Sequence, residues 1–210
     1  MVVENGITYN EQSGSSADEF LDQFPDLKGQ RLILFLGRVH AKKRPDIAIS
    51  AFARVAQHFP DTILVLAGPC EHRYRQRLGR LATQSGIGER VRFTGLIEGR
   101  VRSGAYRVAS LFLLPSMQEN FGIAVAEAMA ASCPVVISEY VDIKSYIEEA
   151  NAGIVCATNP ESVGSALHRL LSDPELARRM GENGRAVVEK YFTWDRASER
   201  LDQIYTDLIG

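Results

Sequence analysis

Glu119 and Glu127 flank the start of a predicted helix, and carboxylates in such a place can accept hydrogen bonds from the hydroxyl groups of a ligand. The apolar segment 111–114, closed by Pro115-Ser116, predicts a strand just before them. Glu119 is therefore expected in the loop at the carboxyl end of a strand. In open parallel α/β sheets, ligands bind at that edge.

The helix itself is predicted from about Gly122 through Ala131. The first amides of a helix have no intrahelical partner and lie at the positive end of its dipole, so they favour an anion. We expect Phe121, Gly122 and Ile123 to offer backbone N–H groups to a phosphate. Carboxylates for hydroxyl groups beside amides for phosphate suit a sugar that is attached to phosphates.

A loop rich in basic residues follows the first predicted strand. It contains Arg38, Lys42, Lys43 and Arg44. A guanidinium offers a planar fork for phosphate oxygens, and an ammonium offers a compact charge. Taken alone, the stretch reads slightly better as a solvated basic loop. Because it lies on the same sheet edge as the Glu119 loop, binding of a diphosphate becomes the favoured interpretation.

The two glutamates could instead be the acid and the nucleophile of a retaining glycosidase, whose carboxyl groups lie about 5 to 5.5 Å apart. The spacing disfavours this, because Glu127 lies about 7.5 Å along the helix axis from its start and Glu119 precedes the helix. The carboxylates suit opposite ends of one elongated ligand better. In a purely structural interpretation, Glu127 pairs with a neighbouring base and Glu119 is a solvated loop acid.

Other motifs are weaker or missing. The turns Gly68-Pro69-Cys70 and Phe93-Thr94-Gly95 follow predicted strands, and either could line a pocket for a nucleotide base. The sequence has no Gly-x-Ser-x-Gly elbow and no P-loop. Its four histidines show no metal-ligand spacing with one another or with cysteine.

Continuous apolar runs predict strands that are covered on both faces. These runs are 32–36, 62–67, 91–94, 111–114, 134–138 and 154–156. Helical patterns separate them, and after Cys156 the pattern is helical only, with helix starts at Pro160, Pro174 and Thr193. The predicted fold class is α/β, a doubly wound parallel, Rossmann-like sheet flanked by helices, with a helical C-terminal tail.

The 210 residues suffice for one generous domain, and a formal net charge of -2 gives no general attraction to nucleic acid or anionic lipid. The 3 cysteines form no Cys-x-x-Cys pair, which indicates reduced thiols and a cytoplasmic protein. No apolar run nears the roughly 20 residues that span a bilayer. Residues 1–30 read as an interdomain linker and lead-in, and residues 31–210 as the domain.

Several motifs stand in a fixed order along the chain. They are Gly37-Arg38 with Lys43 and Asp46, Phe93-Thr94-Gly95, the E-x7-E stretch from Ser116 to Ala130 with Pro134-Val135-Val136 after it, and Tyr191-Phe192-Thr193-Trp194. Together they resemble the nucleotide-sugar-binding domain of the retaining GT-B glycosyltransferases of group 1, also called GT4. The resemblance begins at about Arg31 and implies one half of a GT-B fold.

This resemblance implies three catalytic residues: Arg38 and Lys43 would neutralise the donor diphosphate as it leaves, and Glu119 would hold hydroxyl groups of the donor sugar. Glu127 would hold the ribose hydroxyl groups. The other implied donor-binding residues are Gly37, Thr94, Gly95, Ser116, Asn120, Phe121, Gly122 and Ile123. The donor would be a UDP-, GDP- or ADP-sugar, with no metal and no further cofactor, because fixed cations and helix amides can stabilise the leaving diphosphate.

The acceptor-binding N-terminal domain of these enzymes has no counterpart in the sequence. We therefore expect a donor half that is inactive by itself and that, with its partner domain, moves a hexose-type sugar to a glycan or lipid-linked acceptor. The partner domain would supply any peripheral contact with the inner face of the membrane. Ser132-Cys133 departs from the usual Gly-Leu. Two alternatives stay open, a non-catalytic nucleotide-sugar or partner-binding module and a GT-B-fold sugar-nucleotide epimerase.

Overall fold

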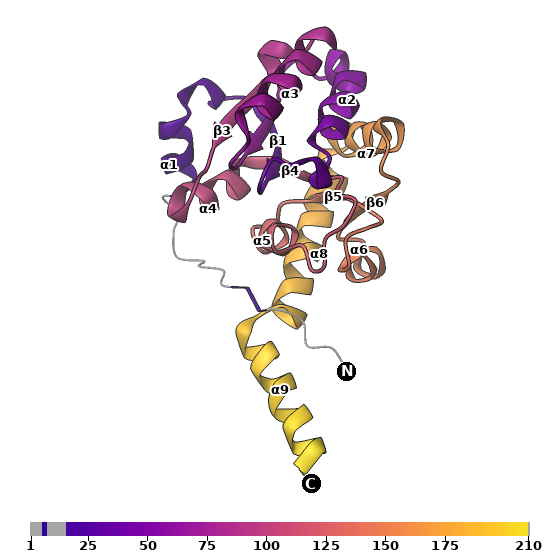
Figure 1. Cartoon of the computed structure of the whole chain (residues 1–210). Helices are drawn as coiled ribbons and strands as arrows, with labels where there is room; N and C mark the ends of the chain where they lie inside the picture. The colour runs from indigo at the N-terminus through magenta and orange to yellow at the C-terminus, as the bar shows by residue number, and fades with distance from the viewer. Residues whose placement is uncertain (1–5, 8–15, 210) are drawn as a thin grey trace.

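A parallel sheet forms the centre of the computed structural model, which describes residues 6–7 and 16–209. Within this part of the chain the sheet has 6 strands in the order β3-β2-β1-β4-β5-β6 (Figure 1). The strands are β1 (Arg31–Leu36), β2 (Thr62–Ala67), β3 (Val91–Gly95), β4 (Ala109–Leu114), β5 (Val135–Ser138) and β6 (Gly153–Cys156). The predicted doubly wound parallel sheet is confirmed.

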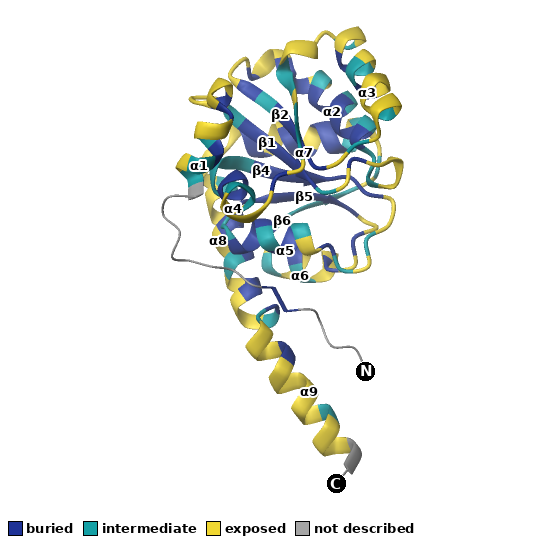
Figure 2. Ribbon diagram, turned by 60° about the vertical axis from the view of Figure 1, so that its left-hand side comes forward, coloured by how far each residue is buried: buried dark blue, intermediate teal, exposed yellow. Residues whose placement is uncertain are grey.

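Helices connect the strands and cover both faces of the sheet (Figure 2). They are α1 (Ser16–Gln23), α2 (Pro45–Val55), α3 (His72–Gln84), α4 (Gly99–Val108), α5 (Ile123–Ala130), α6 (Lys144–Ala150), α7 (Pro160–Ser172), α8 (Pro174–Tyr191) and α9 (Trp194–Ile209). Helix α2 packs against α3 and α7, whereas α1 packs against α4, and α5 against α8. This arrangement follows from right-handed crossovers between parallel strands.

The core consists of the continuous apolar strands and the helix faces that cover them. In β1, every residue after Arg31 is buried, and in β4 the last four are buried. The edge strand β3 is only partly buried, with Arg92 exposed. Burial on both faces at the centre and partial exposure at the edge are what a doubly wound sheet requires.

Three strands, β1, β4 and β6, begin earlier than predicted, and β1 does so by the single residue Arg31. Strand β4 begins at Ala109, which pairs with Leu32 of β1. Strand β6 begins at Gly153, which pairs with Val135, and a Cβ at Gly153 would lie 2.3 Å from the Val135 carbonyl oxygen. Apolar patterning did not find Gly153 because its role depends on having no side chain.

The predicted lead-in contains structure that packs onto the domain. Helix α1 carries Phe20, which is fully buried, and the one-turn helix η1 (Pro25–Leu27) carries Leu27, which is 1% exposed. Residues 1–5 and 8–15 of the predicted linker lie outside the described residues. The limits of the linker and the domain stay a prediction.

Candidate functional site

Three glycines end the strands β1, β2 and β3 at the carboxyl edge of the sheet. Gly37 and Gly68 both have φ +139°, and Gly95 has φ +75°, which favours glycine at each position. The Gly68 amide donates to the Gly95 carbonyl at 2.7 Å, and a Cβ at Gly68 would lie 2.0 Å from the Gly37 carbonyl oxygen. The loops that follow these strands therefore leave the sheet side by side.

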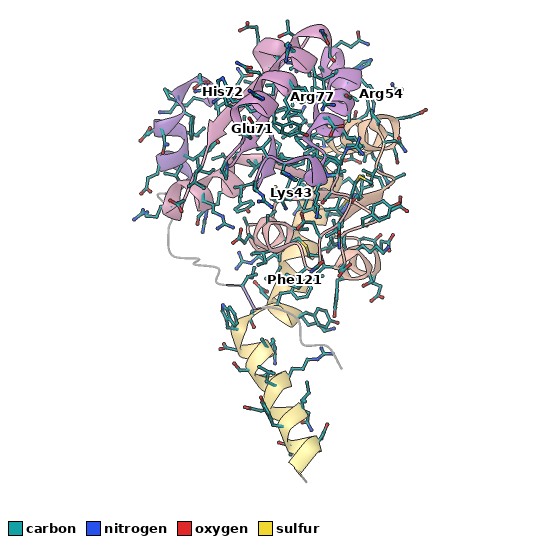
Figure 3. The ribbon with its side chains drawn as sticks, viewed as in Figure 1. Lys43, Arg54, Glu71, His72, Arg77 and Phe121 are labelled. Atoms are coloured by element: carbon teal, nitrogen blue, oxygen red, sulfur yellow. The ribbon has the colours of Figure 1, made fainter. Side chains whose placement is uncertain are left out.

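The loop after β1 returns towards the sheet through the one-turn helix η2 (Ala41–Lys43). The His40 side chain caps this turn, because its Nδ1 accepts from the Lys42 amide at 3.3 Å. Lys43 folds back over the strand end, and a Cβ at Gly37 would lie 3.4 Å from its Cε. In Figure 3, Lys43 lies just above α5.

Arg44 does not take part in the cluster of basic residues that the sequence predicted for this loop. Its backbone is left-handed at φ 52°, and its guanidinium donates to Asp46 at 3.0 and 2.9 Å. Hydrogen bonding to Asp46 is the main reason why the pKa of Arg44 is raised. Of the four basic residues in this loop, the three that line the cleft described below all precede Arg44: Arg38, Lys42 and Lys43.

Ser116 holds the loop after β4 in place. It is fully buried, and its hydroxyl oxygen lies 3.1 Å from the Lys42 carbonyl oxygen and 3.3 Å from Glu119 Oε1, so its one proton can be donated to either acceptor. Behind it, the Ser138 hydroxyl donates to the Ser116 carbonyl. Ser116 therefore helps to position the Glu119 side chain.

Glu119 connects the loop after β4 with the two neighbouring loops, which follow β1 and β5. Its amide donates to the Tyr140 carbonyl at 3.1 Å, and its carbonyl accepts from the Asp142 amide at 3.1 Å. Its carboxylate forms an ion pair with Lys43. The side chains of Glu119 and Lys43 are only 18% and 22% exposed, so the pair is partly shielded from solvent.

Gly122 starts helix α5 in a left-handed conformation with φ +81°. A Cβ there would lie 3.0 Å from Val141 Cγ1, so both the angle and the space favour glycine. The Val125 amide donates to the Gly122 carbonyl at 2.8 Å, so the first-turn amides that lack an acceptor within the helix are those of Ile123 and Ala124. Phe121, just before, packs edge-on against Phe192 at 5.2 Å.

Glu127 lies one turn into α5 and is held from helix α4. Tyr106 donates to its Oε2 at 2.8 Å, and Arg102 donates to the same oxygen. The purely structural interpretation predicted that Glu127 pairs with a neighbouring base, and the contact with Arg102 confirms this pairing. Neither Arg102 nor Tyr106 was predicted as a site residue, and the only signal for them in the sequence is their four-residue spacing in a helical pattern.

These elements enclose a cleft of about 840 Å³. The predicted site residues that line it are Gly37, Arg38, Lys43, Glu119, Asn120, Phe121, Gly122, Ile123 and Glu127. The remaining lining residues are Leu36, Lys42, Arg102, Leu114, Gln118 and Ala124. Cations and helix amides thus face the same space as two carboxylates. The arrangement can bind a long ligand that carries phosphate and hydroxyl groups.

Three predicted donor-binding residues do not line this cleft. Ser116 lies behind it, and Thr94 and Gly95 end β3, beyond β2 and β1. The Thr94 hydroxyl donates to the Gly95 carbonyl at 3.0 Å. Contact of these residues with a ligand stays a prediction.

Within residues 6–7 and 16–209, no group of three or more histidine, cysteine or acidic side chains is placed to hold a metal ion. The predicted metal independence is not tested by this. No helix in the described part of the chain combines the length and apolarity needed to cross a bilayer.

Comparison with known proteins identifies the family. The model of the family "Glycosyl transferases group 1" matches residues 17–187, so the chain belongs to this family. A D-inositol 3-phosphate glycosyltransferase from Streptomyces bingchenggensis is 31% identical over 184 residues, which are 84% of this chain and 40% of that protein. The chain thus spans less than half of the length of this relative.

Solved structures show the same fold. The C-terminal domain of a group 1 glycosyltransferase from Francisella tularensis superimposes with a TM-score of 0.73 at 23% identity, over 91% of this chain and 97% of that one. HepE from Anabaena, solved with UDP and glucose, gives a TM-score of 0.85 at 20% identity, over 98% of this chain and 56% of that one. The predicted half of a GT-B fold is confirmed.

Proposed function

We propose that this chain is the donor-binding half of a retaining, metal-independent glycosyltransferase that takes a hexose-type sugar from a nucleoside-diphosphate sugar. The observation that carries the proposal is the cleft, in which Arg38 and Lys43 approach from β1 and the two glutamates from the β4–α5 unit. The acceptor would be a glycan or a lipid-linked glycan bound by an N-terminal domain.

Each group in the cleft has a chemical task in this proposal. Departure of a nucleoside diphosphate builds negative charge, which Arg38, Lys43 and the first amides of α5 would stabilise. Glu119 would accept hydrogen bonds from hydroxyl groups of the sugar, and Glu127 from those of the ribose. The tight hold on both carboxylates supports such roles, since preorganised groups lose less entropy on binding.

Calorimetric titration of the chain with UDP, GDP and ADP tests this proposal. UDP is the first nucleotide to titrate, because the structurally similar HepE was solved with UDP. We expect one nucleotide to bind, Glu127→Gln to weaken it, and Glu119→Gln to weaken only the corresponding sugar conjugate. Loss of one neutral hydrogen bond costs about 0.5–1.5 kcal/mol and loss of a charged one more, which corresponds to about 3-fold to 10-fold or more in affinity.

Glu148→Gln is the matched control, because Glu148 is an exposed glutamate on α6 that does not line the cleft. Failure of all three nucleotides to bind, or equal losses in all three glutamate variants, would contradict the proposal. We also expect binding without transfer by this chain alone. When the chain is joined to an acceptor domain, NMR of the product should show the anomeric configuration of the donor retained.

A further inference from the structure

Arg102 and Tyr106 lie four residues apart on α4, so both project from the same side of that helix. Both donate to one oxygen of Glu127: Tyr106 Oη reaches Oε2 at 2.8 Å, and Arg102 Nη2 reaches the same atom. The other oxygen, Oε1, takes part in neither hydrogen bond. Two donors from one helix therefore fix the rotation of a carboxylate on the next.

Tyr106 is the rigid member of this clamp. It is 4% exposed, and its ring packs at 5.9 Å against Phe112 of β4. Burial, together with the charge of Glu127, raises the pKa of Tyr106 well above its ordinary value. The hydroxyl group therefore keeps its proton at neutral pH and can donate it to Glu127.

Arg102 is the member that faces the cleft. It lines the cleft beside Glu127, and its side chain is 39% exposed. Burial lowers the pKa of Arg102, but Tyr106 and Glu127 together outweigh burial and leave it raised. Its Nε is buried and has no hydrogen-bond partner within the described residues. The guanidinium therefore stays charged at the wall of the proposed nucleotide site.

We propose that Tyr106 and Arg102 are positioning residues that present Glu127 Oε1 to the ribose hydroxyl groups and thereby set the preference for a ribonucleotide. This inference rests on the proposed function. A carboxylate that is free to rotate must lose that freedom when a ligand binds, whereas a clamped one has already lost it. Removal of either donor should therefore reduce the contribution of the ribose hydroxyl groups, and removal of the uncharged Tyr106 hydroxyl group should leave the remainder of the nucleotide bound as before.

A simpler role for the clamp would be to tie α4 to α5. That role affects stability and the binding of every nucleotide alike. Discrimination between a ribonucleotide and its 2′-deoxy counterpart separates the two possibilities, because only a positioned Glu127 responds to the 2′-hydroxyl group.

The test is calorimetric titration of wild type, Tyr106→Phe and Arg102→Gln with UDP, GDP and ADP and with their 2′-deoxy counterparts. We expect wild type to prefer the ribonucleotide that it binds by about 10-fold, the value of one good hydrogen bond. In both variants the preference should fall to within about 2-fold. The affinity for the deoxynucleotide should stay constant in Tyr106→Phe, which removes no charge, whereas Arg102→Gln also removes a cation from the cleft wall. Arg102→Lys should retain part of the preference, because it keeps the charge.

The matched control is Arg100→Gln. Arg100 lies on the same helix and forms an ion pair with Glu19 at 2.7 Å, but it does not line the cleft. A double-mutant cycle adds a second criterion, in which Tyr106→Phe has no further effect on the preference when Glu127 is already Gln. Unchanged preference in both variants, or equal losses for ribo- and deoxynucleotides, would overturn this inference alone. Failure of wild type to bind any of the three ribonucleotides would overturn the proposed function and this inference with it.

Discussion

Lys43 and Glu119 form an ion pair that connects the loop after β1 with the loop after β4. In the proposed function, a diphosphate would attract the Lys43 ammonium and sugar hydroxyl groups would donate to the Glu119 carboxylate. A phosphate would therefore compete with Glu119 for Lys43, and the exchange would free Glu119 for the sugar. Recognition of the diphosphate and recognition of the sugar would then be coupled through this one pair.

The coupling predicts opposite effects of two substitutions. Lys43→Gln should weaken free UDP by about 10- to 100-fold, because a charged hydrogen bond is worth about 1.5–3 kcal/mol. Glu119→Gln should leave free UDP unchanged or tighten it slightly, because Lys43 loses its competing partner. Titration calorimetry measures both.

Lys28→Gln serves as the control for these variants, because Lys28 pairs with Asp22 at 2.8 Å on the surface and is 55% exposed. Weaker binding of free UDP by the Glu119→Gln variant would contradict this prediction. It would show that Glu119 holds Lys43 in place for the phosphate and does not compete with the phosphate for Lys43.

Gly68→Ala should destabilise the protein and also weaken nucleotide binding. At φ +139° an alanine is strained, and its Cβ would lie 2.0 Å from the carbonyl oxygen of Gly37, which lines the cleft. We expect a loss of about 2 kcal/mol or more in the free energy of unfolding, measured by urea denaturation. Gly79→Ala is the opposite case, because a Cβ there meets nothing within 4 Å in the interior of α3, and it should stabilise by about 0.5–1 kcal/mol.

Much of the fold could be predicted from the sequence because buried parallel strands leave continuous apolar runs, and the ends of those runs fix the edge where ligands bind. The cleft positions of Arg38, Lys43, Glu119 and Glu127 follow from that edge. Arg102 was missed because its contact with Glu127 depends on how α4 packs beside α5, which no local pattern encodes. Ser116 was predicted to bind the donor, and this stays a prediction; the contacts of its hydroxyl group with the Lys42 carbonyl and the Glu119 carboxylate could not be predicted, because they depend on how two loops meet.

Ser132→Gly should stabilise the protein by up to about 1 kcal/mol. Ser132 follows α5 with φ 57°, a conformation that costs a non-glycine residue about 1–2 kcal/mol, part of which the greater chain entropy of unfolded glycine offsets. Ser132→Ala keeps the same strain and should not stabilise, so it is the control in thermal unfolding. Equal stability of the serine and glycine forms would mean that Ser132 gains a compensating interaction.

Arg90→Lys should cost about 2 kcal/mol or more although it preserves the charge. The Arg90 guanidinium stacks on Phe52 at 5.0 Å and donates to the carbonyls of Ala56 and Thr62, each at 2.7 Å. An ammonium cannot reach several carbonyls in this fork geometry. Arg92→Lys, in the exposed pair with Asp26, should change the free energy of unfolding by only about 0.5 kcal/mol, and similar losses for both would contradict the assigned role of Arg90.

Nucleotide binding should be indifferent to divalent metal. In the proposed function Arg38, Lys43 and the first amides of α5 supply the positive charge that a magnesium ion would otherwise provide. The dissociation constant for UDP, or for whichever nucleotide binds, should therefore agree within about 2-fold in EDTA and in excess MgCl2, a difference of about 0.4 kcal/mol. Because these contacts are ionic, raising the salt concentration should weaken binding under both conditions. Tightening by magnesium of 10-fold or more would mean that the fixed cations do not suffice and that the donor enters as a metal complex.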